Sequence, residues 1–133
     1  MTNSLRKTAW LLLFLLLTLQ SIAYDKAVMD RLAALPGISK VEPLESEAYQ
    51  DKYVMFIKQQ VAHDDASVGT FDQRLIVCHV GFDRPTILVT EGYYAHYALR
   101  KGYQEELSKI LNANVITVEY RYFAESVPQP CNW

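Results

Sequence analysis

Short apolar runs separated by polar turns dominate the middle of the chain, and they predict strands. Residues 52–61 alternate in polarity and are rich in Tyr, Val, Phe and Ile, and residues 70–80 end in a second apolar run. A short polar interval joins the two runs, which favours an antiparallel pair. Residues 86–90 form a third, β-branched run that predicts a buried strand, and it breaks at Gly92, where glycine permits a turn.

A helix and a further strand follow this turn. Apolar side chains recur at helical spacing over residues 98–111, and the predicted helix ends at Asn112, a residue type that tolerates left-handed backbone. Residues 115–118 then form another apolar run. Strand, turn, helix and strand make a βαβ crossover, in which the two strands are parallel and the connection is right-handed. The pattern therefore predicts an α/β fold whose mixed sheet has an antiparallel strand pair followed by a parallel crossover, with helices on its faces.

The segment before the first strand has a weaker pattern. Val28, Leu32 and Leu35 are spaced as on one face of a short amphipathic helix, which stops at Pro36 and Gly37. Residues 38–49 contain a further proline and several glutamates. We interpret them as a connector.

The first 23 residues have the pattern of a secretory signal peptide. Arg6 and Lys7 precede an apolar run over residues 9–19, and Ser21 and Ala23 are small residues at the positions that signal peptidase reads. This run is shorter than the roughly 20 residues that a transmembrane helix needs, although an uncleaved membrane anchor is the alternative. We expect an exported protein, periplasmic or secreted, without stable membrane association after cleavage. The predicted parts are a signal peptide (1–23), a helix with its connector (24–48) and the main domain (49–133).

Composition narrows the classes of partner. Hydrophobic residues make up 50% of the chain and charged residues 21%, which is usual for a globular protein with a core. The formal net charge is -2, and the 13 basic residues are scattered along the chain. A nucleic-acid-binding protein needs a basic patch that neutralises phosphates, so we expect no nucleic-acid partner.

The cysteines and histidines do not form a recognisable site. An even count permits one disulfide in an exported protein, but Cys78 lies within an apolar run and we interpret it as a small buried hydrophobe rather than as a partner of Cys131. His63 lies in a predicted turn and His79 in a predicted strand, whereas His96 follows the glycine turn and could line the mouth of a cleft. Their spacing is not that of metal ligands, and we predict neither a metal nor a cofactor.

Three phrases of the sequence carry a resemblance to known enzymes. They are F-D-Q-R at residues 71–74, T-E-G-Y-Y at residues 90–94 and V-E-Y-R-Y-F-A-E-S-V-P at residues 118–128. The chain from residue 52 onward resembles exported serine peptidases of the tripeptidyl aminopeptidase type. It is more distantly similar to prolylcarboxypeptidase and its dipeptidyl peptidase relatives. In those families a phrase close to E-H-R-Y-F-G-E-S-x-P follows the fourth strand, and this sequence departs from it at Tyr120 and Ala124.

The resemblance implies an α/β-hydrolase fold with a Ser-Asp-His triad that hydrolyses peptides near a free amino terminus. In that fold the serine lies in a G-x-S-x-G turn after the fifth strand, which this chain does not reach. We therefore expect an amino-terminal fragment that contains none of the triad and is inactive alone. Ser126 is the nearest substitute, but it lacks both glycines and is followed by Pro128, so we expect it to bond the turn.

We expect the chain to supply part of the oxyanion hole, the group of N–H donors that stabilises the negative charge on the substrate's carbonyl oxygen. The family fold places a backbone N–H donor in the loop after the third strand, here Gly92, Tyr93 and Tyr94. Glu91 and Glu119 follow adjacent parallel strands and therefore lie at the same edge of the sheet. Either carboxylate could bind the ammonium group of a peptide substrate. We favour the alternative that such a glutamate forms an ion pair, with Arg121 as its expected partner.

The expected function is thus that of the amino-terminal portion of an exported serine aminopeptidase. An exported esterase or lipase of the same fold is the competing enzymatic interpretation. An exported binding module, complete without a nucleophile, is the alternative from another class. The coding sequence after Trp133 separates the enzymes from the binding module.

Overall fold

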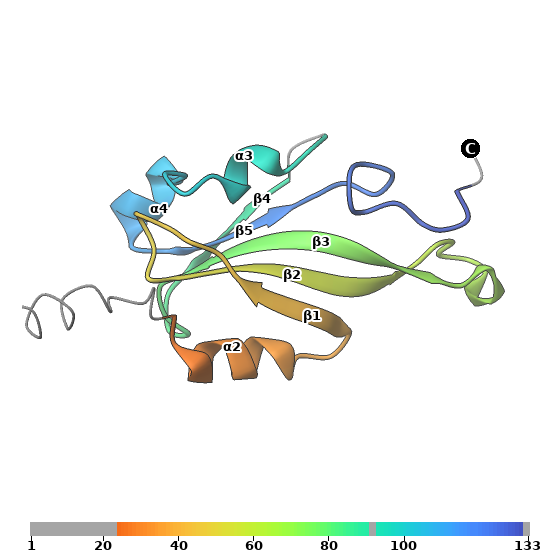
Figure 1. Cartoon of the computed structure of the whole chain (residues 1–133), viewed down its shortest axis with the longest axis horizontal. Coiled ribbons are helices and arrows are strands. Elements are labelled where there is room, and N and C mark those ends of the chain that lie inside the picture. Colours follow the sequence, from red (N-terminus) through yellow and green to blue (C-terminus); the bar gives the residue numbers. More distant parts are fainter. Residues whose placement is uncertain (1–23, 91–92, 132–133) are drawn as a thin grey trace, which may run out of the picture.

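The computed structural model describes residues 24–90 and 93–131, which form one mixed sheet with helices on both faces (Figure 1). The strand order is β1-β2-β3-β5-β4. The strands are β1 (Ile38–Pro43), β2 (Asp51–Gln60), β3 (Thr70–His79), β4 (Thr86–Val89) and β5 (Asn114–Val118). The helices are α2 (Lys26–Ala33), the short 3-10 turn η1 (Ala66–Val68), α3 (His96–Leu99) and α4 (Glu106–Leu111).

The pairing of the central strands agrees with the sequence-based prediction. β2 and β3 form an antiparallel hairpin that is paired along its whole length, from Asp51 opposite His79 to Gln60 opposite Thr70. β4 and β5 are parallel, as the predicted crossover requires. β5 also pairs antiparallel with β3 and so joins the crossover to the hairpin. The mixed sheet is confirmed, and it is compatible with the predicted α/β class.

The prediction of a connector over residues 38–49 is wrong for the first half of this segment, which forms β1. This strand pairs antiparallel with β2 at the outer edge of the sheet. Its register shifts between Ile38 and Lys40, and this irregularity breaks the alternation that identifies a strand in sequence. Pro43 is its last residue, a position that tolerates proline because an edge strand does not need every N–H.

The strand after Pro85 was predicted to be buried, and this is wrong for the described residues. β4 lies at the other edge of the sheet, where its side chains alternate between exposed and half-buried. Leu88 is 60% exposed. An apolar run of this kind is typical of a strand covered on both faces, so β4 presents a surface suited to further packing.

The single helix predicted over residues 98–111 is two short helices. α3 ends when Arg100 adopts an extended backbone, and α4 begins only after Glu105, which is also extended. The buried Lys52 side chain donates a 2.8 Å hydrogen bond from Nζ to the carbonyl of Arg100. Burial lowers the pKa of this lysine. As predicted, Asn112 ends α4 in the left-handed conformation, with φ of 49°.

Each face of the sheet has its own core. Under α2, Val28 and Leu32 pack on Tyr53, Met55 and Val77. On the opposite face, which α3 and α4 cover, two clusters of buried residues both pack against the partly buried Tyr103. Their buried members are Tyr49, Cys78, Val115, Ile76, Ala95 and Ala98. Helices therefore cover both faces, as the sequence predicted.

Cys78 is the small buried hydrophobe expected from the sequence. Its side chain is fully buried, and burial raises the pKa of its thiol to about 12. Cys78 and Cys131 are both free thiols.

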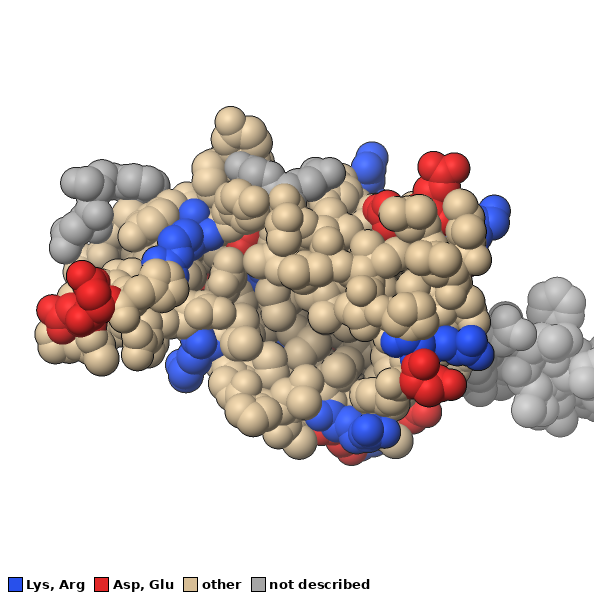
Figure 2. Space-filling view, turned by 180° about the vertical axis from the view of Figure 1, so that it is seen from behind, with Lys and Arg blue, Asp and Glu red and all other residues tan. Residues whose placement is uncertain are grey.

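Charged side chains of both signs lie mainly around the margin of the face shown in Figure 2, and most of the middle of that face is formed by other residues. Within residues 24–90 and 93–131, no helix is both long and apolar enough to span a membrane.

Candidate functional site

Two loops meet at the carboxyl ends of the parallel strands β4 and β5. The first follows β4 and is described from Tyr93 onward, and the second follows β5 and contains the motif at residues 119–128. In open α/β sheets, ligands bind outside the carboxyl ends of the strands. This edge of the sheet is therefore the candidate site.

Glu119 lies where the two loops meet, and its carboxylate is fully buried. Oε2 accepts hydrogen bonds from the guanidinium of Arg74 and from the backbone N–H of Ala95, the latter at 3.4 Å. Oε1 accepts from the backbone N–H of Glu125 at 3.1 Å and from the hydroxyl of Ser126 at 3.0 Å. One carboxylate thus contacts β3 and both loops.

Arg74 reaches this carboxylate from β3, with its side chain 8% exposed. The main chain also holds the pair together, because Glu119 donates from its N–H to the carbonyl of Arg74 at 3.1 Å. The side-chain amide of Gln73 donates to the carbonyl of Glu119 at 2.7 Å. Among the described residues, nothing accepts a hydrogen bond from Nε of Arg74.

Ser126 is fully buried and uses its hydroxyl in both directions. Oγ accepts from the backbone N–H of Arg74 at 2.9 Å and donates to Glu119. The side chain bonds the turn, which is the role that the sequence favoured over that of a nucleophile.

The motif loop itself is a tight turn with left-handed backbone. The N–H of Ser126 donates to the carbonyl of Phe123, and the N–H of Tyr122 donates to the carbonyl of Ser126. Tyr122 and Ala124 have positive φ angles of 71° and 40°. The loop is also attached to the end of the hairpin, because the Arg121 guanidinium donates to the carbonyls of residues 60 and 61.

Aromatic rings lie on the solvent side of the site. Phe123 receives edge-to-face contacts from Tyr93 and Tyr94, with ring centroids 5.3 and 5.6 Å apart. Tyr93 is 68% exposed and Tyr94 is 56% exposed. Tyr94 also packs against His96. We call these four side chains the aromatic rim, and a rim of this kind can contact the apolar parts of a ligand.

Comparison with known proteins places this arrangement in a family. Residues 23–133 match the model of the family described as PS-10 peptidase S37. The chain belongs to this peptidase family. It is also 35% identical over 106 residues to the prolyl tri/tetrapeptidyl aminopeptidase of Streptomyces mobaraensis. The aligned part is 80% of this chain and 21% of that relative, so the chain spans about a fifth of the relative's length. No solved structure gave a significant match.

The peptidase family confirms the resemblance that the sequence motifs carried. Of the site residues predicted within it, Tyr93 and Tyr94 lie at the carboxyl edge, while Glu91 and Gly92 lie outside the described residues. Glu119 does form an ion pair, but its partner is Arg74 and not the expected Arg121. Arg121 instead binds main-chain carbonyls. Contact between Glu119 and a residue 45 positions earlier depends on the pairing of β3 with β5, which the sequence pattern does not specify.

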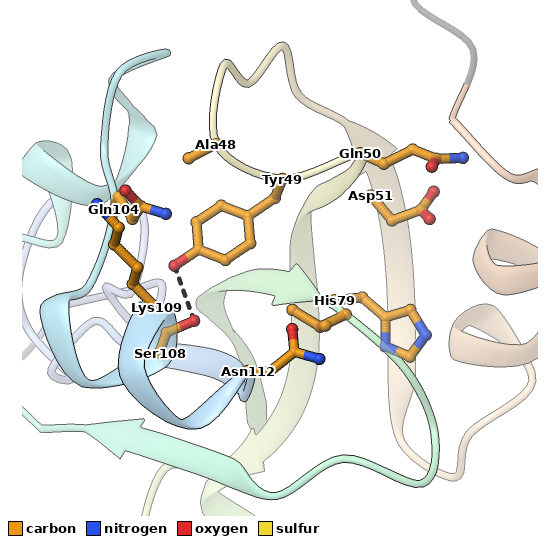
Figure 3. A pocket seen from close by; sticks show the side chains of 10 residues that line it. Ala48, Tyr49, Gln50, Asp51, His79, Gln104, Ser108, Lys109 and Asn112 are labelled. Carbon is orange, nitrogen blue, oxygen red and sulfur yellow. Dashed lines mark hydrogen bonds between the residues drawn. The ribbon is translucent and has the colours of Figure 1, made fainter.

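A cleft of about 370 Å³ lies at the opposite edge of the peptidase sheet, where β4 and β5 begin (Figure 3). Tyr49 and Ser108 are joined across its wall by a 3.1 Å hydrogen bond between their hydroxyls. Asp51 and His79 lie on the other side of the cleft (Figure 3). This is the amino-terminal edge of the parallel strands, and we do not assign the peptidase site to it.

The histidines occupy separate places in the peptidase chain. His79 is buried at the end of β3 with its ring 4.4 Å from that of Phe82, as expected for a histidine in the core of a sheet. Burial lowers the pKa of His79. His96 is exposed and belongs to the aromatic rim, and His63 lies in the turn after β2. The part of the chain that the structure describes contains no cluster of side chains that could hold a metal ion.

Proposed function

We propose that this chain is the amino-terminal part of an exported serine peptidase with an α/β-hydrolase fold, which hydrolyses peptides near a free amino terminus. One observation carries the proposal: the motif at residues 118–128 packs at the carboxyl ends of β4 and β5, beside the loop that follows β4. Membership of the peptidase family and the similarity to an enzyme named as an aminopeptidase support it.

The strand order supports the fold. An antiparallel hairpin (β2 and β3), followed by β5 and then β4 parallel to it, is the order in which the first four strands of an α/β-hydrolase sheet lie, with β1 added outside. Next to β4, such a sheet has its fifth strand, which leads to the nucleophile. The exposed edge of β4 is open for that strand.

In the proposed reaction, the loop after β4 stabilises the negative charge that forms on the carbonyl oxygen of the substrate. A main-chain N–H of Tyr93 or Tyr94 is the proposed donor. The N–H of Ala95 is already used by Glu119. Each such donor lowers the barrier by about 3–4 kcal/mol. Gly92 is the proposed turn residue that brings this backbone to the substrate.

The substrate ammonium requires a carboxylate that can reach it. The carboxylate of Glu119 is buried and already accepts from four donors. Of the two glutamates considered, Glu91 is therefore the one that we propose for this role. The serine, aspartate and histidine of the triad are proposed to lie beyond Trp133.

The coding sequence after Trp133 tests the proposal first. We expect the reading frame to continue and to encode G-x-S-x-G, then Asp, then His. The protein from that longer frame should hydrolyse chromogenic tri- and tetrapeptide substrates, and should require their free amino terminus. A fluorophosphonate probe should label it but not the 133-residue chain.

Three results would contradict the proposal. A stop codon directly after Trp133 favours the binding module. Labelling of the 133-residue chain by the probe places a nucleophile within it. Hydrolysis of simple esters with no action on peptides favours the esterase or lipase.

A further inference from the structure

We propose that Glu119 is a positioning residue: its buried carboxylate holds the loop after β4 and the motif loop after β5 in the arrangement that the reaction needs. This inference rests on the proposed function for the meaning of that arrangement. The tether itself rests on the hydrogen bonds described above.

The carboxylate is used to its full capacity by donors alone. Oε2 accepts from Arg74 and from the N–H of Ala95, and Oε1 accepts from the N–H of Glu125 and the hydroxyl of Ser126. Ser126 donates its single hydroxyl proton to Oε1, and the same oxygen accepts from the N–H of Arg74. An amide at this position would direct its own N–H groups at donors.

The tether acts on the oxyanion candidates through their neighbour in the chain. Ala95 directly follows Tyr94, so the bond from its N–H to Glu119 restricts the backbone orientation of the loop one residue away from a proposed donor. Ala95 is itself 2% exposed and belongs to the core cluster under α3. The carboxylate therefore links this loop to a rigid part of the sheet.

The same carboxylate positions the aromatic rim from the other side. Phe123, which both tyrosine rings contact, lies in the motif loop that Glu119 holds through Glu125 and Ser126. A second tie joins the loops independently, because the hydroxyl of Tyr120 donates to the carbonyl of Thr90 at 3.2 Å. Loss of the Glu119 carboxylate therefore removes its hydrogen bond to Ala95 in the loop after β4 and its two hydrogen bonds to the motif loop. The bond between Tyr120 and Thr90 remains.

The ionic partner explains why the position holds a carboxylate. Arg74 is buried too, with 8% of its side chain exposed, and a buried cation without a counter-charge is strongly unfavourable. The pair also lies directly beyond the β3–β5 pairing, where Leu75 is opposite Val118. The charge of Glu119 thus compensates that of Arg74, and the bonds that its carboxylate accepts from Ala95, Glu125 and Ser126 position the two loops.

The test uses the full-length peptidase with Glu119→Gln. We expect kcat to fall by about 10- to 100-fold, because the donor is displaced and not removed, and complete removal of one oxyanion donor costs about 100- to 1,000-fold. KM should change by less than about threefold. Hydrogen exchange of the Ala95 amide, followed by mass spectrometry of the peptide that contains it, should become at least about tenfold faster. Either an unchanged kcat or unchanged exchange at Ala95 overturns the proposal.

A double variant separates positioning from folding. Arg74→Met with Glu119→Met removes both charges, so no buried cation is left without a counter-charge, and the thermal midpoint should rise above that of Glu119→Gln. The Ala95 and Glu125 N–H groups stay without their acceptor, so kcat should stay low. If kcat recovers together with the midpoint, Glu119 has only a structural role and the proposal is wrong.

Asp51→Asn is the matched control. Asp51 is also a buried carboxylate that accepts a main-chain N–H and a hydroxyl, from Asp25 and Tyr53, but it lies at the opposite edge of the sheet. Its substitution should leave kcat and Ala95 exchange within about twofold of the parent. If the control changes both as much as Glu119→Gln does, general destabilisation is the cause and the proposal is wrong.

The two proposals fail in different ways. A parent protein that cleaves no peptide contradicts the proposed function, whereas the exchange of Ala95 still reports on the tether. An active peptidase in which Glu119→Gln retains its kcat contradicts the positioning role alone.

Discussion

Ala124 has a backbone conformation that favours glycine over alanine. Its φ of 40° lies in the left-handed region, where a Cβ costs about 1–2 kcal/mol and glycine costs nothing. The related families usually have glycine at this place in the motif. The alanine side chain is exposed, so no packing compensates for the strain.

Ala124→Gly is therefore expected to stabilise the protein by about 0.5–1 kcal/mol, measured by urea unfolding. Ala33→Gly is the control, because Ala33 is exposed in α2 and has helical backbone. There the same change should destabilise by about 1 kcal/mol. Equal effects of the two substitutions would contradict the assignment of strain to Ala124.

At the scale of elements, buried polar contacts decide where helices end. Arg100 leaves the helical conformation, and its carbonyl accepts from the buried ammonium of Lys52. The apolar spacing over residues 98–111 is real, but Leu107, Ile110 and Leu111 are each more than half exposed. Periodicity alone therefore predicts one helix. The structure has two, because the helix ends where Lys52 of β2 binds the carbonyl of Arg100.

The contact between α2 and the end of β3 is expected to depend on pH. His79 is buried there against Phe82, and the Arg31 guanidinium of α2 lies 3.5 Å from the centre of the Phe82 ring. Burial lowers the pKa of His79 and Arg31 lowers it further, while Asp51 and Asp25 act in the opposite direction.

The sign follows from proton uptake. The unfolded chain protonates this histidine near its ordinary pKa of 6.5, and the folded chain only at lower pH. Stability conferred by the neutral ring is thus complete above pH 6.5 and is lost as the pH falls from there to the folded pKa. His79→Phe should flatten the fall in urea midpoint between pH 8 and pH 5, and an unchanged slope would contradict this assignment.

At the scale of the whole molecule, the described part leaves apolar surface uncovered. Leu88 on the edge strand β4 is 60% exposed, and Ile110 on α4 is 69% exposed. An unpaired edge strand with exposed apolar side chains promotes association. In the proposed peptidase, further strands and helices cover these surfaces.

The 133-residue chain expressed alone should therefore bind the dye ANS and associate with increasing concentration, as followed by light scattering. Leu88→Lys should reduce the association, because a charged side chain on an edge strand opposes edge-to-edge pairing. The longer protein serves as the reference and should bind little dye. A monodisperse chain without dye binding would show that these surfaces need no partner.

Local sequence patterns are enough to predict the strands of the hairpin and the crossover, the left-handed end of α4 and the family. Each of these depends on neighbouring residues: alternation, a turn residue or an ordered motif. Other features depend on residues that are distant in the chain and meet only in the folded protein. β1 is identified as a strand only by its pairing with β2. The exposure of β4 follows from its position at the edge of the sheet. Glu119 pairs with Arg74 because β3 and β5 are adjacent, and that adjacency brings a charge 45 residues away closer than Arg121, two positions along the chain.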